Sequence, residues 1–128
     1  MSDTLRFDLD IPASVRRGVA VPITLRVIDT GPKAIELCLR GRTIAFDIVV
    51  ENAMSETVWH RLKGAAIDAS LQLRILQPGE ELVLASQWNQ KSNDGHDVPT
   101  GEYTVRASLL SDRPDPFTFP KRSFRITG

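Results

Sequence analysis

Apolar and polar residues alternate with a period of two along most of this 128-residue chain. Because successive side chains of an extended strand point to opposite faces, this alternation predicts β-strands with one buried face. The segment 44–50 is apolar at both sets of alternating positions, which predicts a strand packed against other structure on both faces. The clearest alternating series are Leu5, Phe7, Leu9 and Ile11; Val21, Ile23, Leu25 and Val27; Ile35, Leu37 and Leu39; Leu71, Leu73 and Ile75; and Tyr103, Val105, Ala107 and Leu109.

Turn sequences separate these strands at a spacing of roughly 8–12 residues, which is typical of an all-β sandwich. Pro78 and Gly79, for example, are suited to the two central positions of a tight turn. Only residues 64–71 could form a helical turn, and they are too few to change the fold class. We find no repeat and no linker. We therefore expect one domain over residues 1–128, an Ig-like antiparallel β-sandwich of about eight or nine strands.

The segment from Trp88 to Tyr103 carries two turn sequences, Asn-Asp-Gly and Pro-Thr-Gly, between two apolar runs. A tyrosine that follows such a glycine at the start of a strand predicts a tyrosine corner, in which the ring is buried and the hydroxyl bonds to upstream backbone. Trp59 and Trp88 lie inside alternating runs. We predict that they pack in the sandwich; the alternative is that they anchor an interface.

Charge and cysteine content exclude several classes of function. Sixteen Lys plus Arg residues balance sixteen Asp plus Glu residues, so no net field would attract nucleic acid or an anionic membrane. No apolar run approaches the roughly 18 residues of a membrane span. Cys38 is the only cysteine, so no internal disulfide can form. Its position between Leu37 and Leu39 places it on the less buried face or between sheets. With no secretory signal at the start, we expect a cytoplasmic protein.

Groups that could act together in catalysis or metal binding are not evident in the sequence. His60 and His96 lie in different predicted elements without further metal ligands at suitable spacing. If Gly95 occupied the glycine position of a calcium loop, only Asp94 would place a carboxylate correctly. We therefore predict no metal, no cofactor and no enzymatic activity. A histidine beside a carboxylate in a cleft would favour an enzyme instead.

Two long polar loops, 89–100 and 111–120, could carry recognition because a rigid sandwich holds its loops in place. The second is stiffened by prolines, and we expect it to display Phe117 and Phe119. A proline-constrained loop with an apolar tip loses little entropy on binding. The alternative is an ordinary crossing between sheet edges. Our predicted partner-binding residues are Pro114, Asp115, Pro116, Phe117 and Thr118, with Phe117 entering a pocket of the partner.

Between residues 21 and 110 several sequence blocks follow one another in a characteristic order. These blocks are V-P-I-T-L-R-V-I-D-T-G, A-F-D-I-V-V-E-N with V-W-H-R-L, L-Q-P-G-E-E-L, W-N-Q and V-P-T-G-E-Y-T-V. In order and spacing they resemble the intracellular proteinase inhibitor (BsuPI-type) domain family. The W…N-D-G…V-P-x-G-x-Y portion is also similar to Ig-like modules of flagellar hook-capping proteins. The chain departs from the family pattern in the turn M-S-E-T, which lacks the common glycine, and in the segment after Leu110.

The resemblance implies an Ig-like sandwich and, for the name-giving member, inhibition of an intracellular serine proteinase. Our first hypothesis is a non-enzymatic domain that binds another protein, an intracellular subtilisin-like proteinase. The alternative is a structural or assembly module that binds a partner protein without inhibiting a proteinase, for example by strand addition. Neither hypothesis includes nucleic acid or membrane as a partner.

Overall fold

A computed structural model describes residues 5–67, 69–112 and 116–128. Within these residues the chain forms only strands and loops, which confirms the predicted all-β sandwich. No helix in this part has the length and hydrophobicity of a membrane span. The strands are β1 (Leu5–Asp10), β2 (Ser14–Arg16), β3 (Val21–Asp29), β4 (Ile35–Arg40), β5 (Phe46–Asn52), β6 (Thr57–His60), β7 (Leu71–Leu76), β8 (Glu81–Trp88), β9 (Gly101–Leu109), β10 (Phe117–Thr118) and β11 (Arg122–Thr127).

The described residues thus contain two strands more than the upper end of the predicted range. The additional strands are β2, with three residues, and β10, with two. Strands of this length are too short to show alternation, so neither could be found from the sequence pattern. Both are positioned by longer neighbours, because β2 pairs with β11 and β10 pairs with β9.

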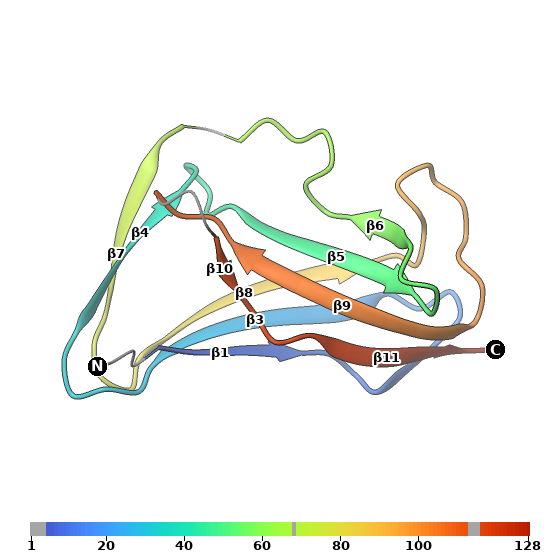
Figure 1. Cartoon of the computed structure of the whole chain (residues 1–128), viewed down its shortest axis with the longest axis horizontal. Helices are drawn as coiled ribbons and strands as arrows, with labels where there is room; N and C mark the ends of the chain where they lie inside the picture. The colour runs from blue at the N-terminus through green and yellow to red at the C-terminus, as the bar shows by residue number, and fades with distance from the viewer. Residues whose placement is uncertain (1–4, 68, 113–115) are drawn as a thin grey trace.

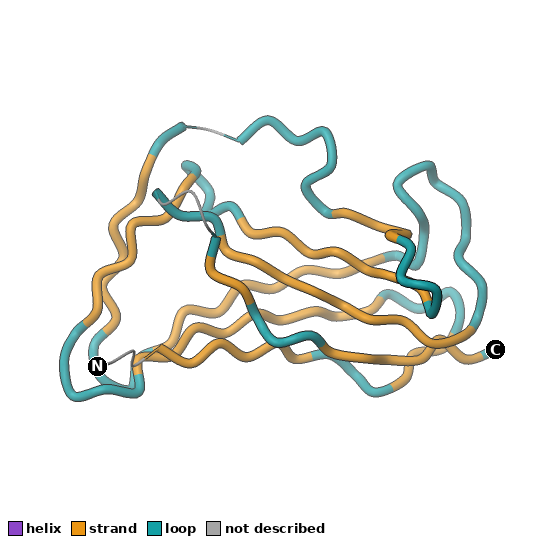
Figure 2. The backbone as a smooth tube through the Cα atoms, viewed as in Figure 1, coloured by secondary structure: helices purple, strands orange, loops and turns teal. Residues whose placement is uncertain are grey.

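The strands form three sheets (Figure 1). One layer has the order β1-β3-β8, and the other has the order β2-β11-β9-β5-β6 with β10 added to β9. Strands β4 and β7 form a separate two-stranded sheet at one end of the sandwich. Figure 2 shows the loop 89–100 standing at the opposite end. Both ends of the molecule can therefore present residues to a partner.

The hydrophobic core lies between the layers and is one cluster that extends from Leu9 to Ile126. Alternate residues of β3 are buried, as the period of two requires. The prediction that segment 44–50 packs on both faces is wrong for Val49, although Ala45 is buried. Phe46, Ile48 and Val50 face the core, whereas Val49 is only half-buried on the outer face of the sheet. Val49 is partly covered by its cross-strand neighbours His60 and Arg106, and not by a third layer.

The tyrosine corner is present. The Tyr103 hydroxyl donates to the Pro99 carbonyl at 2.5 Å, and the ring is 97% buried against Trp88 and Phe124. Trp88 is itself buried and stacks on Trp59, and its indole N–H donates to the Lys91 carbonyl at 2.8 Å. These contacts confirm that both tryptophans pack in the sandwich.

Tyr103→Phe is expected to lower the free energy of unfolding by about 1 kcal/mol, because it removes one buried hydrogen bond and leaves the ring in place. Burial raises the pKa of Tyr103, so the folded state favours the protonated phenol. This contribution to the free energy of unfolding is complete at pH values below the unfolded pKa of about 10, and it is lost as the pH rises through the folded pKa. Urea unfolding of both proteins at neutral and alkaline pH tests both effects. Ser123→Ala, which removes an exposed hydroxyl, should change little.

Candidate partner-binding surface

The outer face of β7 exposes three large apolar side chains in a row. Leu71, Leu73 and Ile75 are 53%, 59% and 49% exposed. The other exposed large hydrophobic residues of the described chain occur singly on different elements. A contiguous apolar group on a soluble domain marks an interaction site more often than a scattered residue does. We refer to these three residues as the β7 apolar stripe.

The stripe faces outward because of its pairing with β4. In this antiparallel pair Leu71, Leu73 and Ile75 lie opposite Arg40, Cys38 and Glu36. Directly opposed residues project from the same face of a sheet. The other face of β4 carries the buried core residues Leu37 and Leu39. The stripe therefore lies on the side of the two-stranded sheet that points away from the core, together with the half-buried Cys38, as predicted for that thiol.

The outer edge of β7 also exposes backbone groups. The Gly41 N–H donates to the Ser70 carbonyl at 2.7 Å, and this pair sets the register of the ladder. Because antiparallel hydrogen bonding alternates along a strand, residues 72, 74 and 76 bond toward β4. The N–H and C=O groups of the stripe residues then point to the other edge. No strand pairs with that edge in the described part of the chain.

The opposite edge of β4 agrees with this register. There the Arg40 N–H donates to the Leu110 carbonyl at 3.2 Å, and the Asp112 N–H donates to the Cys38 carbonyl at 3.1 Å. Strand β4 is therefore held on both edges, whereas β7 is held on one. The contacts also place the start of the 111–120 loop beside β4, at the same end of the molecule as the stripe.

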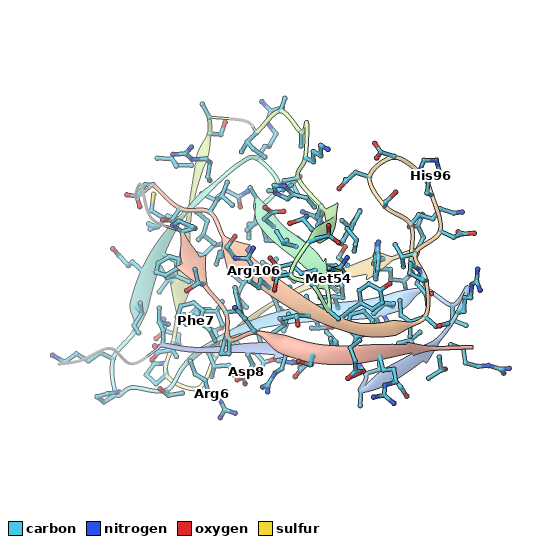
Figure 3. The ribbon with its side chains drawn as sticks, turned by 45° about the vertical axis from the view of Figure 1, so that its right-hand side comes forward. Arg6, Phe7, Asp8, Met54, His96 and Arg106 are labelled. Carbon is cyan, nitrogen blue, oxygen red and sulfur yellow. The ribbon has the colours of Figure 1, made fainter. Side chains whose placement is uncertain are left out.

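The predicted partner-binding loop differs from expectation where it is described. Pro114 and Asp115 lie outside the described residues, and Pro116 and Thr118 are exposed. The prediction that the loop displays Phe117 and Phe119 is wrong. Phe117 is half-buried and stacks on Phe7, with ring centroids 5.6 Å apart, and Phe119 is buried edge-to-face against the same ring. Phe7 lies beneath β10 (Figure 3).

These two rings turn inward because β10 pairs with the end of β9, which places Phe117 opposite Leu109. Covering Phe7 removes more apolar surface from water than projecting into solvent would. Pro116 and Thr118 instead line a shallow hollow of about 260 Å³ on the outer face of the larger sheet, together with Asp47, Val49, Arg106, Ala107 and Ser108. Among the described residues of the loop, the exposed ones are Asp112, Pro116, Thr118 and Pro120, so no large apolar side chain is displayed there.

His60 lies beside the carboxylate of Asp47, the kind of pair that would favour an enzyme. Its Nε2 hydrogen-bonds one Asp47 oxygen, and the other oxygen accepts the Leu62 N–H at 3.1 Å. Ser108 faces Asp47 from β9, whereas His60 is on β6, so the carboxylate separates the hydroxyl from the imidazole. A nucleophile and its base must be in direct contact, and here they are not.

The surroundings of His60 give it a structural role. The Asn93 side chain accepts the His60 N–H at 2.8 Å and donates to its carbonyl at 3.0 Å, which ties the 89–100 loop to β6. His96 lies near the outer end of that loop (Figure 3). Among the residues that the structure describes, no three His, Cys, Asp or Glu side chains gather to hold a metal.

Arg61 follows directly after His60, at the end of β6. Its guanidinium lies 3.8 Å from the centre of the Phe46 ring and donates to the Phe46 carbonyl at 2.5 Å. Burial lowers the pKa of Arg61, and the Asp47 charge opposes that shift. The side chain also lines a hollow of about 320 Å³ between residues 41–45 and 61–67. Its contacts are with its own sheet, so we assign it to fold stability.

Fold and surface together define a β-sandwich domain in which strand β7 has an open edge and an exposed apolar face. A family model of the intracellular proteinase inhibitors (BsuPI) matches residues 8–114. The chain belongs to this family, which confirms the resemblance seen in the sequence blocks. Membership in an inhibitor family implies a non-enzymatic role. A comparison with curated protein sequences finds no match.

Solved structures with a similar fold belong to proteins of very different kinds. A β-glucosidase from Listeria innocua in complex with gluconolactone aligns with a TM-score of 0.53 at 12% identity, over 97% of this chain and 16% of that one. An alkylpurine DNA glycosylase from Pseudomonas fluorescens bound to DNA aligns at 0.52 and 11%, over 98% and 31%. The CARDB domain of a Pyrococcus furiosus protein in complex with di-metal ions aligns at 0.51 and 12%, over 96% and 92%. At these identities the similarity shows the fold alone.

The apolar stripe was the surface feature that sequence reasoning missed. The series Leu71, Leu73 and Ile75 predicted a strand, and the strand is present. Alternation shows which residues share a face but not which face meets the core. The sequence carries no signal for this, because the outward face of β7 follows from its pairing with β4, which is far away along the chain.

Proposed function

We propose that this protein is a cytoplasmic inhibitor that binds an intracellular subtilisin-like serine proteinase and blocks access to its active site. The observation that carries the proposal is the family match over residues 8–114. It agrees with the separation of the Ser108 hydroxyl from the His60 imidazole by the Asp47 carboxylate. An inhibitor needs only to bind and remain intact, so the domain requires no catalytic groups of its own.

The geometry at the β4 and β7 end suits binding to a protein. The apolar stripe lies on a strand whose neighbour β4 is anchored in the core through Leu37 and Leu39. Side chains on such a fixed strand lose little conformational entropy when they bind. We propose the 114–118 segment as a second contact from the same end. Its exposed Pro116 and Thr118 are available for it, whereas Phe117 would first have to leave Phe7.

An assembly module without inhibitory action is the second candidate. The open edge of β7 favours it, because strand addition can join two proteins without closing any active site. A measurement of proteinase inhibition distinguishes the inhibitor from the assembly module. An assembly module would bind its partner and leave peptide hydrolysis unchanged.

Titration of a purified intracellular subtilisin with the protein tests inhibition directly. Hydrolysis of a short chromogenic peptide is expected to fall to zero near equimolar inhibitor, and intact mass should show that the inhibitor remains uncut. A cysteine proteinase of unrelated fold serves as the control and should keep its activity. Unchanged hydrolysis at micromolar excess of the protein would reject the proposal.

Thr118→Lys tests the second contact in the same titration. Weaker inhibition would support a role for the 114–118 segment, and unchanged inhibition would remove it.

A further inference from the structure

We propose that an extended segment of the partner protein adds to the open edge of β7 as an antiparallel strand, with alternate apolar side chains placed over Leu71, Leu73 and Ile75. The proposal rests on the proposed function only in taking the partner to be a protein. In strand addition, main-chain hydrogen bonds supply affinity and alternate side chains supply specificity. Within the described chain, the edge of β7 has unpaired main-chain groups and alternate apolar side chains.

Edge strand β1 is protected by charges, and β7 is not. Exposed edges are usually blunted by charged side chains, which discourage pairing with another chain. Strand β1 carries such charges, with Arg6 paired to Asp8 and Asp10 paired to Arg26. On β7 the only charged residue is Arg74, and it projects from the face opposite the stripe. An unprotected apolar edge is a template for another strand.

The size of the surface favours one extended segment over a second copy of the chain. A stable dimer buries about 800 Å² on each partner. A strand of six residues, such as β7, is about 20 Å long. Three half-exposed side chains along such a strand cover much less than a stable dimer requires. They match the footprint of a single strand laid against the edge.

Charges at the two ends of the stripe define the polarity of the segment. Arg40 lies beside Leu71 and Glu36 lies beside Ile75, on the same face as the stripe. Both are exposed, and no ion pair joins either of them to another described residue. An antiparallel segment would place its C-terminal end near Arg40 and its N-terminal end near Glu36. The fitting segment therefore has a basic residue first, alternating apolar residues next and an acidic residue last.

A synthetic peptide tests this directly. The probe has capped ends, an N-terminal lysine, valines alternating with threonines and a C-terminal aspartate, so that the valines and both charges share one face. Its binding to the whole protein is followed by amide hydrogen exchange in NMR spectra. The amides of Leu71, Leu73 and Ile75 are expected to gain protection. Those of residues 72 and 74, already bonded to β4, should change little.

Leu73→Lys places a charge in the centre of the stripe and is expected to weaken peptide binding about tenfold or more, the loss typical of a central interface residue. Val83→Lys is the matched control, because Val83 is also a half-exposed apolar residue on an edge strand, β8. It should leave binding unchanged. Circular dichroism and thermal unfolding of both variants establish that each is folded.

Several outcomes would overturn strand addition. These are protection without the alternating pattern, equal binding by a peptide with the terminal charges exchanged, or equal binding by the Leu73→Lys variant. Protection of residues 71, 73 and 75 that rises with protein concentration in the absence of peptide would instead assign the edge to a second copy of the chain.

The titration with subtilisin separates this proposal from the proposed function. If the wild-type protein inhibits but the peptide does not bind, and Leu73→Lys inhibits equally well, strand addition at β7 is wrong and inhibition stands. If the peptide protects alternate amides but the wild-type protein leaves hydrolysis unchanged, the inhibitor function is wrong and strand addition stands.

Discussion

Replacement of Trp88 by alanine is expected to lower the free energy of unfolding by about 3–5 kcal/mol, the range for removing a buried aromatic side chain. Trp88 is 1% exposed and contacts the rings of Trp59, Tyr103 and Phe124. Its loss would leave a cavity among rings that are fixed by their own strands. The indole hydrogen bond that holds the Lys91 carbonyl would also be lost. Urea unfolding measured by circular dichroism tests the prediction.

Val83→Ala is the control on the same strand. Val83 is 46% exposed, so its truncation should change stability by no more than about 0.5 kcal/mol. Similar effects of the two substitutions would mean that the assigned faces of β8 are wrong. Trp59→Ala should fall between them, because Trp59 is only partly buried and covers one side of Trp88.

Leu37→Ala is expected to cost about 2–5 kcal/mol, because the side chain is 97% buried and its removal leaves a cavity beneath the two-stranded sheet. The matched substitution is Leu73→Ala. Leu73 projects from the other face of the same sheet and is 59% exposed. Its truncation should cost well under about 1 kcal/mol, since exposed positions away from packed contacts tolerate change.

Equilibrium unfolding of the two leucine variants measures the difference. The comparison has a direct bearing on function, because the same experiment that places Leu37 in the core places Leu73 on the surface. If Leu73→Ala proved as costly as Leu37→Ala, the stripe would be buried and could not receive a strand. If neither had an effect, the whole β4 and β7 sheet would be less ordered than its hydrogen bonds indicate.

Much of the fold could be predicted because alternation is a local signal. Each of the five alternating series corresponds to a strand, and the tyrosine corner was predicted from the turn sequence and strand start around Gly101 and Tyr103. The family blocks were equally local, and the family match confirms them. These features depend on residues close together in the chain, so their physical causes are contained in short segments.

The candidate site depended on contacts between distant segments. A period of two shows that Leu71, Leu73 and Ile75 share a face, but it does not show whether that face meets the core. The pairing of β7 with β4 decides this. The sequence predicted Phe117 at an exposed loop tip, whereas in the structure its ring stacks on Phe7, which is far away in sequence. The sequence by itself determined the strands, their turns and the family. Only the tertiary structure decided which apolar residues stayed outside, because long-range pairing determines which surfaces are covered.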